Sequence, residues 1–209
     1  MKREFGFLIA VLATALAFSN PAFAHHPMGG MTPQTFAQGF LSGVGHPIIG
    51  VDHFAFLLVI ALLSVSLGGF LRLAVPLAFV AATVAGTFAH IAAADFPLSE
   101  AIVASSALIG GLLVLSKRDV PGLLLTVGVT AFGLFHGYAL GESIIGAEQT
   151  PLVAYLIGFA AIQLAVIVGA AWAFKALGSR STVLGSRTRL ATGVLATVTG
   201  AAFLISNLT

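Results

Sequence analysis

Apolar residues dominate this chain in long stretches, and polar residues collect in short breaks between them. Six of the stretches are long enough to cross a bilayer as helices of about 20 residues. The breaks carry turn or charge signals, such as paired glycines or an Asp-Phe-Pro run. The pattern predicts an all-α polytopic membrane protein with six transmembrane helices in a single domain, residues 25–209. The predicted spans are 48–68, 71–92, 98–116, 121–141, 151–174 and 187–206.

Residues 1–24 are organised like a secretory signal peptide. A lysine and an arginine precede an apolar core, and Ala-Phe-Ala at 22–24 forms a small-residue cleavage site. The alternative is an uncleaved first helix, and in both cases the residues that follow are exported. After cleavage, His25 and His26 would lie next to the new amino terminus, as part of a flexible linker or as a loose metal trap.

The amino-acid composition indicates that the surface of the protein faces lipid rather than water. Hydrophobic residues make up 58% of the 209 residues and charged residues only 8%, whereas soluble domains carry about 25% charged residues. The molecular surface must therefore face lipid, which makes the bilayer a partner of the protein. A net charge of +2 without a basic run excludes nucleic acid as a partner. The absence of cysteine excludes disulfides, thiolate ligands and a cysteine nucleophile, so any metal must be bound by nitrogen and oxygen.

The distribution of charge predicts the orientation. All basic residues outside the signal lie in or beside the loops after the first, third and fifth spans, and the positive-inside rule makes these loops cytoplasmic. They are Arg72, Lys117, Arg118, Lys175, Arg180, Arg187 and Arg189. Most acidic residues and every histidine of the mature chain fall towards the other side. We therefore expect a bacterial inner-membrane protein whose mature termini are both periplasmic. The short apolar segment 34–45 is predicted to lie at the outer interface or to re-enter.

Three ionisable residues, His46, Asp52 and His53, stand at the entrance to the first span, where hydrocarbon cannot solvate them. In an unbroken helix the two histidines would lie about 10.5 Å apart along the axis. That separation is too large for one ion with bonds of about 2 Å. Pro47 and Gly50 lie between them, however, and both can break a helix. A bend would bring the three side chains together as a metal site. The alternative is that each histidine only forms hydrogen bonds at the interface.

A second group of the same chemistry lies at the outer end of the fourth span, where His136 precedes Glu142 among glycines. Neutral imidazole and carboxylate suit nickel, cobalt, zinc or copper. His90, near the outer end of the second span, is a further candidate ligand or gate, or a capped interfacial histidine. Glu100 begins the third span, where the helix dipole alone already favours a negative charge. These residues complete the candidate ligand set.

The two motifs resemble the signatures of a known family. G-x-G-H-P-x-x-G-x-D-H at 43–53 and F-H-G-Y-A-x-G-E at 135–142 are similar to the paired motifs of the HupE/UreJ family, and Glu100 resembles the acidic start of its third span. The resemblance covers essentially the whole mature chain. It implies a nickel or cobalt permease with six spans, often associated with hydrogenase or urease maturation.

By motif position, the resemblance carries over two groups of functional residues. They are His46, Asp52 and His53 in the first span, and Phe135, His136 and Glu142 in the fourth. Many members of the family have a second histidine where this chain has Leu140. The resemblance therefore leaves the exact ligand set, and with it the choice of metal, open.

The leading functional hypothesis is a secondary transporter whose substrate is a divalent transition metal, nickel or cobalt. Acidic residues at the outer side would raise the local cation concentration, and the candidate ligands would replace the hydration shell. The chain has no P-loop and needs no organic cofactor, so uptake would depend on a gradient or on a cytoplasmic metal-trapping or metalloenzyme-maturation protein.

Two other functional classes use the same residues. A membrane-embedded metal-dependent hydrolase or oxidoreductase would need a base such as Glu100 beside the metal, although no HExxH motif is present. A haem-binding electron-transfer subunit would use two histidines from facing helices. A purely structural scaffold leaves the histidines unexplained. The sequence specifies no inward path, because the inner half offers only hydroxyl groups and Gln163.

Overall fold

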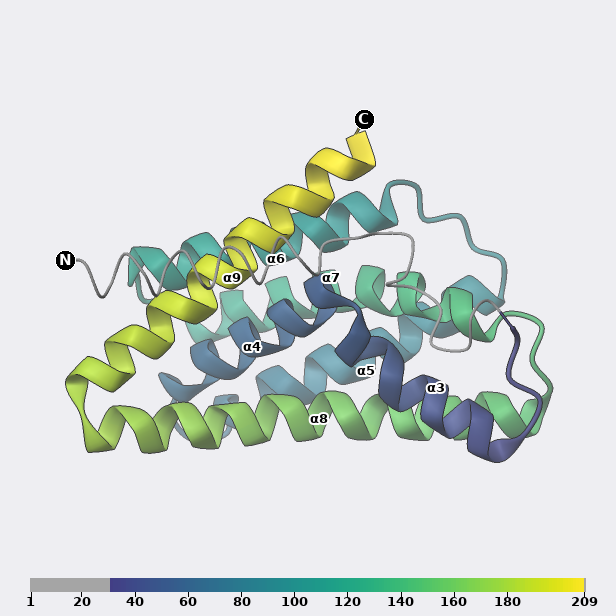
Figure 1. Ribbon diagram of the computed structural model, residues 1–209, viewed down its shortest axis with the longest axis horizontal. Helices are drawn as coiled ribbons and strands as arrows, with labels where there is room; N and C mark the ends of the chain where they lie inside the picture. The colour runs from purple at the N-terminus through teal and green to yellow at the C-terminus, as the bar shows by residue number, and fades with distance from the viewer. Residues whose placement is uncertain (1–30, 209) are drawn as a thin grey trace.

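The computed structural model describes residues 31–208, and almost all of them are helical (Figure 1). No strand occurs within that range. The predicted signal peptide and His25 and His26 lie outside the described residues. The elements in order are α3 (Phe36–Ile49), α4 (Val51–Val65), α5 (Leu71–Ile91), α6 (Ser99–Ser116), α7 (Gly122–Gly141), the short 3-10 helix η1 (Glu142–Ile144), α8 (Gln149–Arg180) and α9 (Thr182–Leu208).

Helices α5 to α9 are each long and apolar enough to cross a membrane. Helices α3 and α4 form a pair bent by 76°, which makes a sixth span if the pair is taken as one. The all-α, multi-pass prediction is confirmed. The structure differs from the prediction between the last two spans. The basic region at 175–189, which the sequence predicts to be a loop, is almost entirely helical, because α8 continues to Arg180 and α9 begins at Thr182. With about 1.5 Å per residue, α8 is roughly 48 Å long and extends beyond a hydrocarbon core of about 30 Å.

Three helix pairs lie side by side: α5 with α7, α6 with α9, and α3 with α8. Small residues allow these backbones to approach closely, as is usual between helices in a membrane. A Cβ atom at Gly137 of α7 would overlap the carbonyl group of Thr83 in α5. A Cβ atom at Gly43 of α3 would overlap the carbonyl oxygen of Tyr155 in α8. These contacts fix the depth of α3 and α7, which carry two of the candidate ligands.

The two ends of the bundle differ in charge. The α4–α5, α6–α7 and α8–α9 connections lie at one end, on the left of Figure 1, and the α5–α6 and α7–α8 connections lie at the other. The seven described basic residues belong to the first three connections or to the helix turns beside them. We call this end the basic end. The predicted separation of basic residues from most acidic residues is therefore present in the fold.

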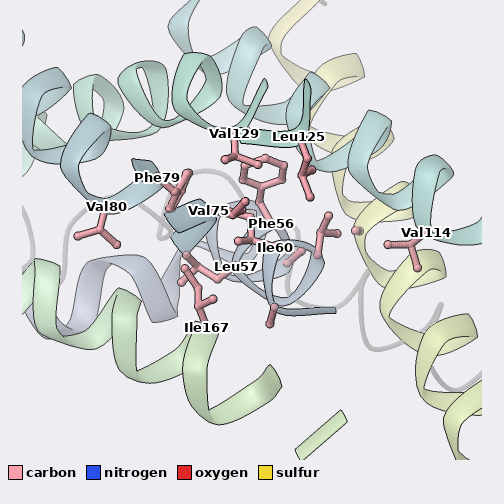
Figure 2. Close-up of a cluster of buried hydrophobic side chains, with 14 residues drawn as sticks. Phe56, Leu57, Ile60, Val75, Phe79, Val80, Val114, Leu125, Val129 and Ile167 are labelled. Atoms are coloured by element: carbon pink, nitrogen blue, oxygen red, sulfur yellow. The ribbon is translucent and has the colours of Figure 1, made fainter. Parts of the chain in front are cut away.

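A cluster of buried apolar side chains fills the space between α4, α5, α7 and α8, as Figure 2 shows. Phe56 and Ile60 of α4 meet Phe79 of α5, and Ile167 of α8 lies against the same cluster. All four side chains are at most 3% exposed. The cluster contains no ionisable side chain among the described residues. It therefore lies between the histidines near the start of α4 and the basic end.

Candidate metal centre

The candidate site is built on the break between α3 and α4. Gly50 has an extended backbone (φ −67°, ψ 98°), and its N–H donates to the carbonyl oxygen of His46 at 3.0 Å. The next helix then starts, with the N–H of Phe54 bonded to the carbonyl oxygen of Gly50 at 2.8 Å. Pro47 remains inside α3. Helix α3 therefore ends at Gly50, and Pro47, the other residue expected to break it, does not interrupt it.

Four of the predicted site residues are buried together with their polar atoms. His46, Asp52, His53 and His136 are each no more than 1% exposed. They come from the last turn of α3, the first turn of α4 and the carboxyl-terminal half of α7. Burial of ionisable groups at this density is costly unless they pair with one another or with a ligand.

The imidazoles of His53 and His136 are in direct contact. Their Nδ1 atoms lie 2.8 Å apart, and their ring centroids are separated by 4.8 Å. Aromatic rings from the apolar cluster hold His136 from the other side. Phe56 stacks on it at a centroid distance of 4.8 Å, and Phe79 meets it edge-on at 5.6 Å. The position of His136 is therefore set by helices α4 and α5 as well as by its own helix.

Ser106 of α6 determines where the protons of this pair lie. Its hydroxyl oxygen is 2.6 Å from the carbonyl oxygen of Val103 and 2.7 Å from Nε2 of His136. A hydroxyl carries one proton and a carbonyl only accepts. Both contacts are satisfied when Ser106 donates to Val103 and accepts from Nε2–H of His136. Nδ1 of His136 then accepts from Nδ1–H of His53, which leaves a lone pair on Nε2 of His53, the form that binds metals.

His46 also contacts a serine. Its Nδ1 lies 3.0 Å from the hydroxyl oxygen of Ser143, which lies 3.3 Å from the carbonyl oxygen of Leu140. That carbonyl oxygen already accepts from the hydroxyl group of Tyr155 at 2.6 Å. Ser143 can therefore donate to Leu140 or to His46, so the surrounding contacts set the tautomers of His53 and His136 but not that of His46.

Asp52 provides a buried carboxylate directly before His53, in the first turn of α4. Its Oδ1 accepts the backbone N–H of His53 at 2.9 Å, and the amino-terminal end of α4 favours a negative charge there. Its Oδ2 is buried and has no hydrogen-bond partner among the described residues. A buried carboxylate oxygen without a partner is costly. A cation bound at this place would satisfy it.

The remaining predicted ligands are not buried with these four. Glu142 is exposed on η1, and Glu100 is half-buried in the first turn of α6. His90 is half-buried, with its Nδ1 2.6 Å from the carbonyl oxygen of Tyr138. Its ring also stacks on that of Tyr138 at a centroid distance of 4.0 Å.

Two side chains of the cluster, His53 and His136, are hydrogen-bonded to each other, so the cluster would have to rearrange before it could coordinate a metal ion. Within residues 31–208, no three His, Asp or Glu side chains already surround a position that could hold an ion. The ring centroids of His46 and His53 are 6.3 Å apart, whereas two imidazoles on one ion lie roughly 5 Å apart. The 2.8 Å between the Nδ1 atoms of His53 and His136 is close to the roughly 3 Å between two ligand atoms on one ion. The rings of His46 and His53 would therefore have to approach each other by roughly 1 Å to bind one ion.

Sequence reasoning did not single out Ser106 or Ser143. Serines are common in membrane spans as hydrogen-bonding partners between helices, so neither residue stands out. Ser105 directly precedes Ser106 and bonds only to the carbonyl oxygen of Ala101 in its own helix, at 2.7 Å. The register of α6 against α7 is what distinguishes the two serines.

Comparison with known proteins agrees with this architecture. The model of the family described as HupE / UreJ protein matches residues 12–203. Protein HupE of Rhizobium leguminosarum bv. viciae is 29% identical over 196 residues, which cover 93% of this chain and 97% of that protein. No solved structure matches the chain. Proteins of the matching family are membrane proteins of the transporter type and are not enzymes. The chain belongs to the HupE / UreJ family.

Proposed function

We propose that this protein is a secondary permease that takes up a divalent transition metal, nickel or cobalt, across the bacterial inner membrane. The basic end faces the cytoplasm, as the positive-inside rule requires, and the histidine cluster lies in the outer half of the membrane. Both mature termini are periplasmic. The single observation that carries this proposal is the burial of three imidazoles and one carboxylate at a helix break.

The chemistry of the cluster suits a borderline cation. Nitrogen from His46, His53 and His136 with oxygen from Asp52 is a donor set that nickel and cobalt accept. The carboxyl-terminal end of α3 carries the partial negative charge of its helix dipole, which also favours a cation. Broken helices recur at the binding sites of secondary transporters, because the helix ends at the break direct their partial charges at the bound ion.

Metal binding competes with protonation of the imidazoles. For both Nδ1 atoms to bind one ion, the proton that lies between His53 and His136 must move to Nε2 of His53. Acid therefore weakens binding, because protonated imidazoles cannot act as ligands. Glu142 stands exposed just beyond α7 and attracts cations to the entrance, together with other acidic residues of the outer side. We place Glu142, Glu100 and His90 around the entrance rather than in the buried ligand set.

Release towards the cytoplasm requires movement of the helices. The apolar cluster of Phe56, Ile60, Phe79 and Ile167 closes the space below the histidines. We therefore assign the structure to a state that is closed on the cytoplasmic side, and transport to alternating access around the cluster. A gradient or a cytoplasmic metal-trapping or maturation protein provides the direction of transport.

A haem would not fit the observed pairing. An iron porphyrin would have to lie between the two histidine nitrogens that bind it. The Nδ1 atoms of His53 and His136 contact each other directly at 2.8 Å, and Phe56 and Phe79 occupy the other sides of His136. This arrangement favours an ion as the ligand.

Metal accumulation by cells that express the full chain tests the proposal. We expect radioactive nickel or cobalt to accumulate in a way that His53→Ala and His136→Ala each reduce at least about tenfold, as the loss of a metal contact usually does. His90→Ala is the matched control, because its ring bonds to Tyr138, and it should retain most of the uptake. Zinc and copper uptake compared in the same cells identify the preferred ion. Unchanged uptake in both cluster variants would overturn the proposal.

A further inference from the structure

A groove at the basic end is not used by the proposed transport mechanism. It lies between the end of α4, the beginning of α5 and the second half of α8, and its volume is about 230 Å³. Most of its wall is apolar: Val65, Leu73, Pro76, Ile167, Val168 and Ala171. Three polar side chains, Ser64, Arg72 and Lys175, complete the lining together with Trp172.

The groove opens sideways from the bundle. Leu73 is 59% exposed, Val168 50% and Trp172 74%, and all three belong to helices that cross the membrane. Apolar side chains exposed on such helices face lipid. Tryptophan is typical of the boundary between hydrocarbon and headgroups. A wall of this kind suits an acyl chain and is unsuited to a hydrated cation.

The polar side chains of the groove are suited to an anion. Arg72 holds the carbonyl oxygen of Leu67 through Nε at 3.1 Å and Nη2 at 2.9 Å. A guanidinium has five N–H donors, so others remain for a phosphate. Lys175 is exposed and adds a second positive charge to the lining.

Ser64 supplies an independent sign of a ligand. The residue is 1% exposed and lines the groove, and its hydroxyl oxygen has no hydrogen-bond partner among the described residues. Serines such as Ser66 and Ser105 donate to a carbonyl oxygen of their own helix. Within residues 31–208, the hydroxyl groups of Ser42 and Thr199 are also buried without a partner, but neither residue lines the groove. A buried hydroxyl without a partner is costly. The oxygen is covered in this arrangement, so a rotation of the Ser64 side chain is needed before a polar group in the groove can satisfy it.

We propose that this groove binds one anionic phospholipid from the leaflet at the basic end, which the positive-inside rule makes the cytoplasmic one. The phosphate lies between Arg72 and Lys175, an ester or glycerol oxygen contacts Ser64, and one acyl chain follows the apolar wall. Basic pockets between transmembrane helices on the cytoplasmic side bind anionic headgroups in this manner. The site is independent of the metal that the protein carries.

Trp172 is the only tryptophan of the chain and lines the groove, so its fluorescence reports on the site. The full-length protein is placed in phosphatidylcholine vesicles that contain a small fraction of brominated lipid, either phosphatidylglycerol or phosphatidylcholine. Bromine quenches tryptophan on contact. We expect brominated phosphatidylglycerol to associate at least about fivefold more strongly, the effect of one basic residue near an anionic headgroup. Equal quenching by the two lipids would overturn the proposal without the need for any variant.

Charge variants test which residues hold the headgroup. Arg72→Gln with Lys175→Gln should abolish the preference for phosphatidylglycerol. Lys117→Gln with Arg118→Gln is the matched control, because both residues are exposed at the same end but do not line the groove. The control should keep the preference. If both double variants lose it, a general surface potential is the cause and the proposal is wrong.

Two further measurements separate a lipid from other occupants. Ala171→Phe adds a ring to the apolar wall and should lower quenching by brominated acyl chains, while circular dichroism shows that the helices remain. Addition of inorganic phosphate should leave the preference intact. Displacement by millimolar phosphate would identify a free anion as the ligand and contradict a phospholipid site.

Discussion

At the scale of single residues, the hydrogen bonds of His136 decide which nitrogens of the cluster carry protons. Ser106 fixes one nitrogen of His136, and the other meets His53. Partners outside the ligand set orient histidine ligands in this way in many metal sites and raise their affinity. We therefore expect Ser106 to contribute to metal binding without contacting the ion.

Substitution of this serine gives the first prediction. Ser106→Ala leaves Nε2–H of His136 buried without an acceptor, which costs about 1–3 kcal/mol of stability. It also frees the imidazole to change tautomer, so we expect nickel affinity to fall about tenfold to 100-fold. Isothermal titration of the purified full chain measures the affinity. Ser105→Ala is the control and should bind nickel like the wild type, because Ser105 bonds only within α6. Equal affinity of the two variants would contradict this role.

At the scale of elements, the break between α3 and α4 and the contact of α5 with α7 assemble the site. The bend of 76° at Gly50 brings His46 next to His53. The packing of α7 against α5 sets the position of His136 along the bundle axis. Gly86 and Gly137 allow this packing, because a Cβ atom at either position would overlap the facing backbone.

The contact between α5 and α7 leads to a second prediction, which compares two glycines of α7, Gly137 and Gly128. Gly137→Ala places a methyl group against the carbonyl group of Thr83, and overpacking of this kind costs about 1–3 kcal/mol. Gly128→Ala meets open space and should gain up to about 1 kcal/mol from helix propensity. Thermal unfolding in detergent should therefore lower the melting temperature of the first variant and preserve or raise that of the second. A similar change in both would mean that α5 and α7 are further apart.

The comparison with the sequence is instructive at this scale. The apolar stretches predict the helices, and Pro47 and Gly50 predict a break, because both signals are local. The extension of α8 to Arg180 is not evident from hydropathy, since the added turns lie outside the hydrocarbon. The contact of His53 with His136 depends on the register between α4 and α7, which no local pattern encodes. For the same reason Glu142 appeared equivalent to His136 in the sequence, although it is exposed and directly follows the last residue of α7.

At the scale of the whole molecule, the two ends of the bundle differ in their ionisable residues. Basic residues gather at one end and the buried histidines lie towards the other, with an apolar cluster between them. Under the positive-inside rule, our proposal places the candidate ligands in the periplasmic half of the membrane. Such an arrangement suits a protein that captures its substrate outside and releases it after a conformational change.

The orientation can be tested with single cysteines, because the chain contains none. Lys117→Cys marks the α6–α7 connection and Glu148→Cys the α7–α8 connection, and both side chains are exposed. In intact cells, a membrane-impermeant maleimide should label the cysteine at 148, whereas the cysteine at 117 should react only after the membrane is opened. The reverse pattern would place the basic end outside and would contradict the proposed direction of uptake.

The most direct test of the central claim is X-ray absorption spectroscopy of the nickel-loaded full chain. The account predicts a nitrogen and oxygen shell with two or three imidazoles, reduced by one in His53→Ala and in His136→Ala. The double variant His25→Ala/His26→Ala serves as the control for the amino-terminal histidines and should give the wild-type spectrum. A shell without imidazole, or one that the cluster variants leave unchanged, would contradict the claim that the buried histidines bind the transported ion.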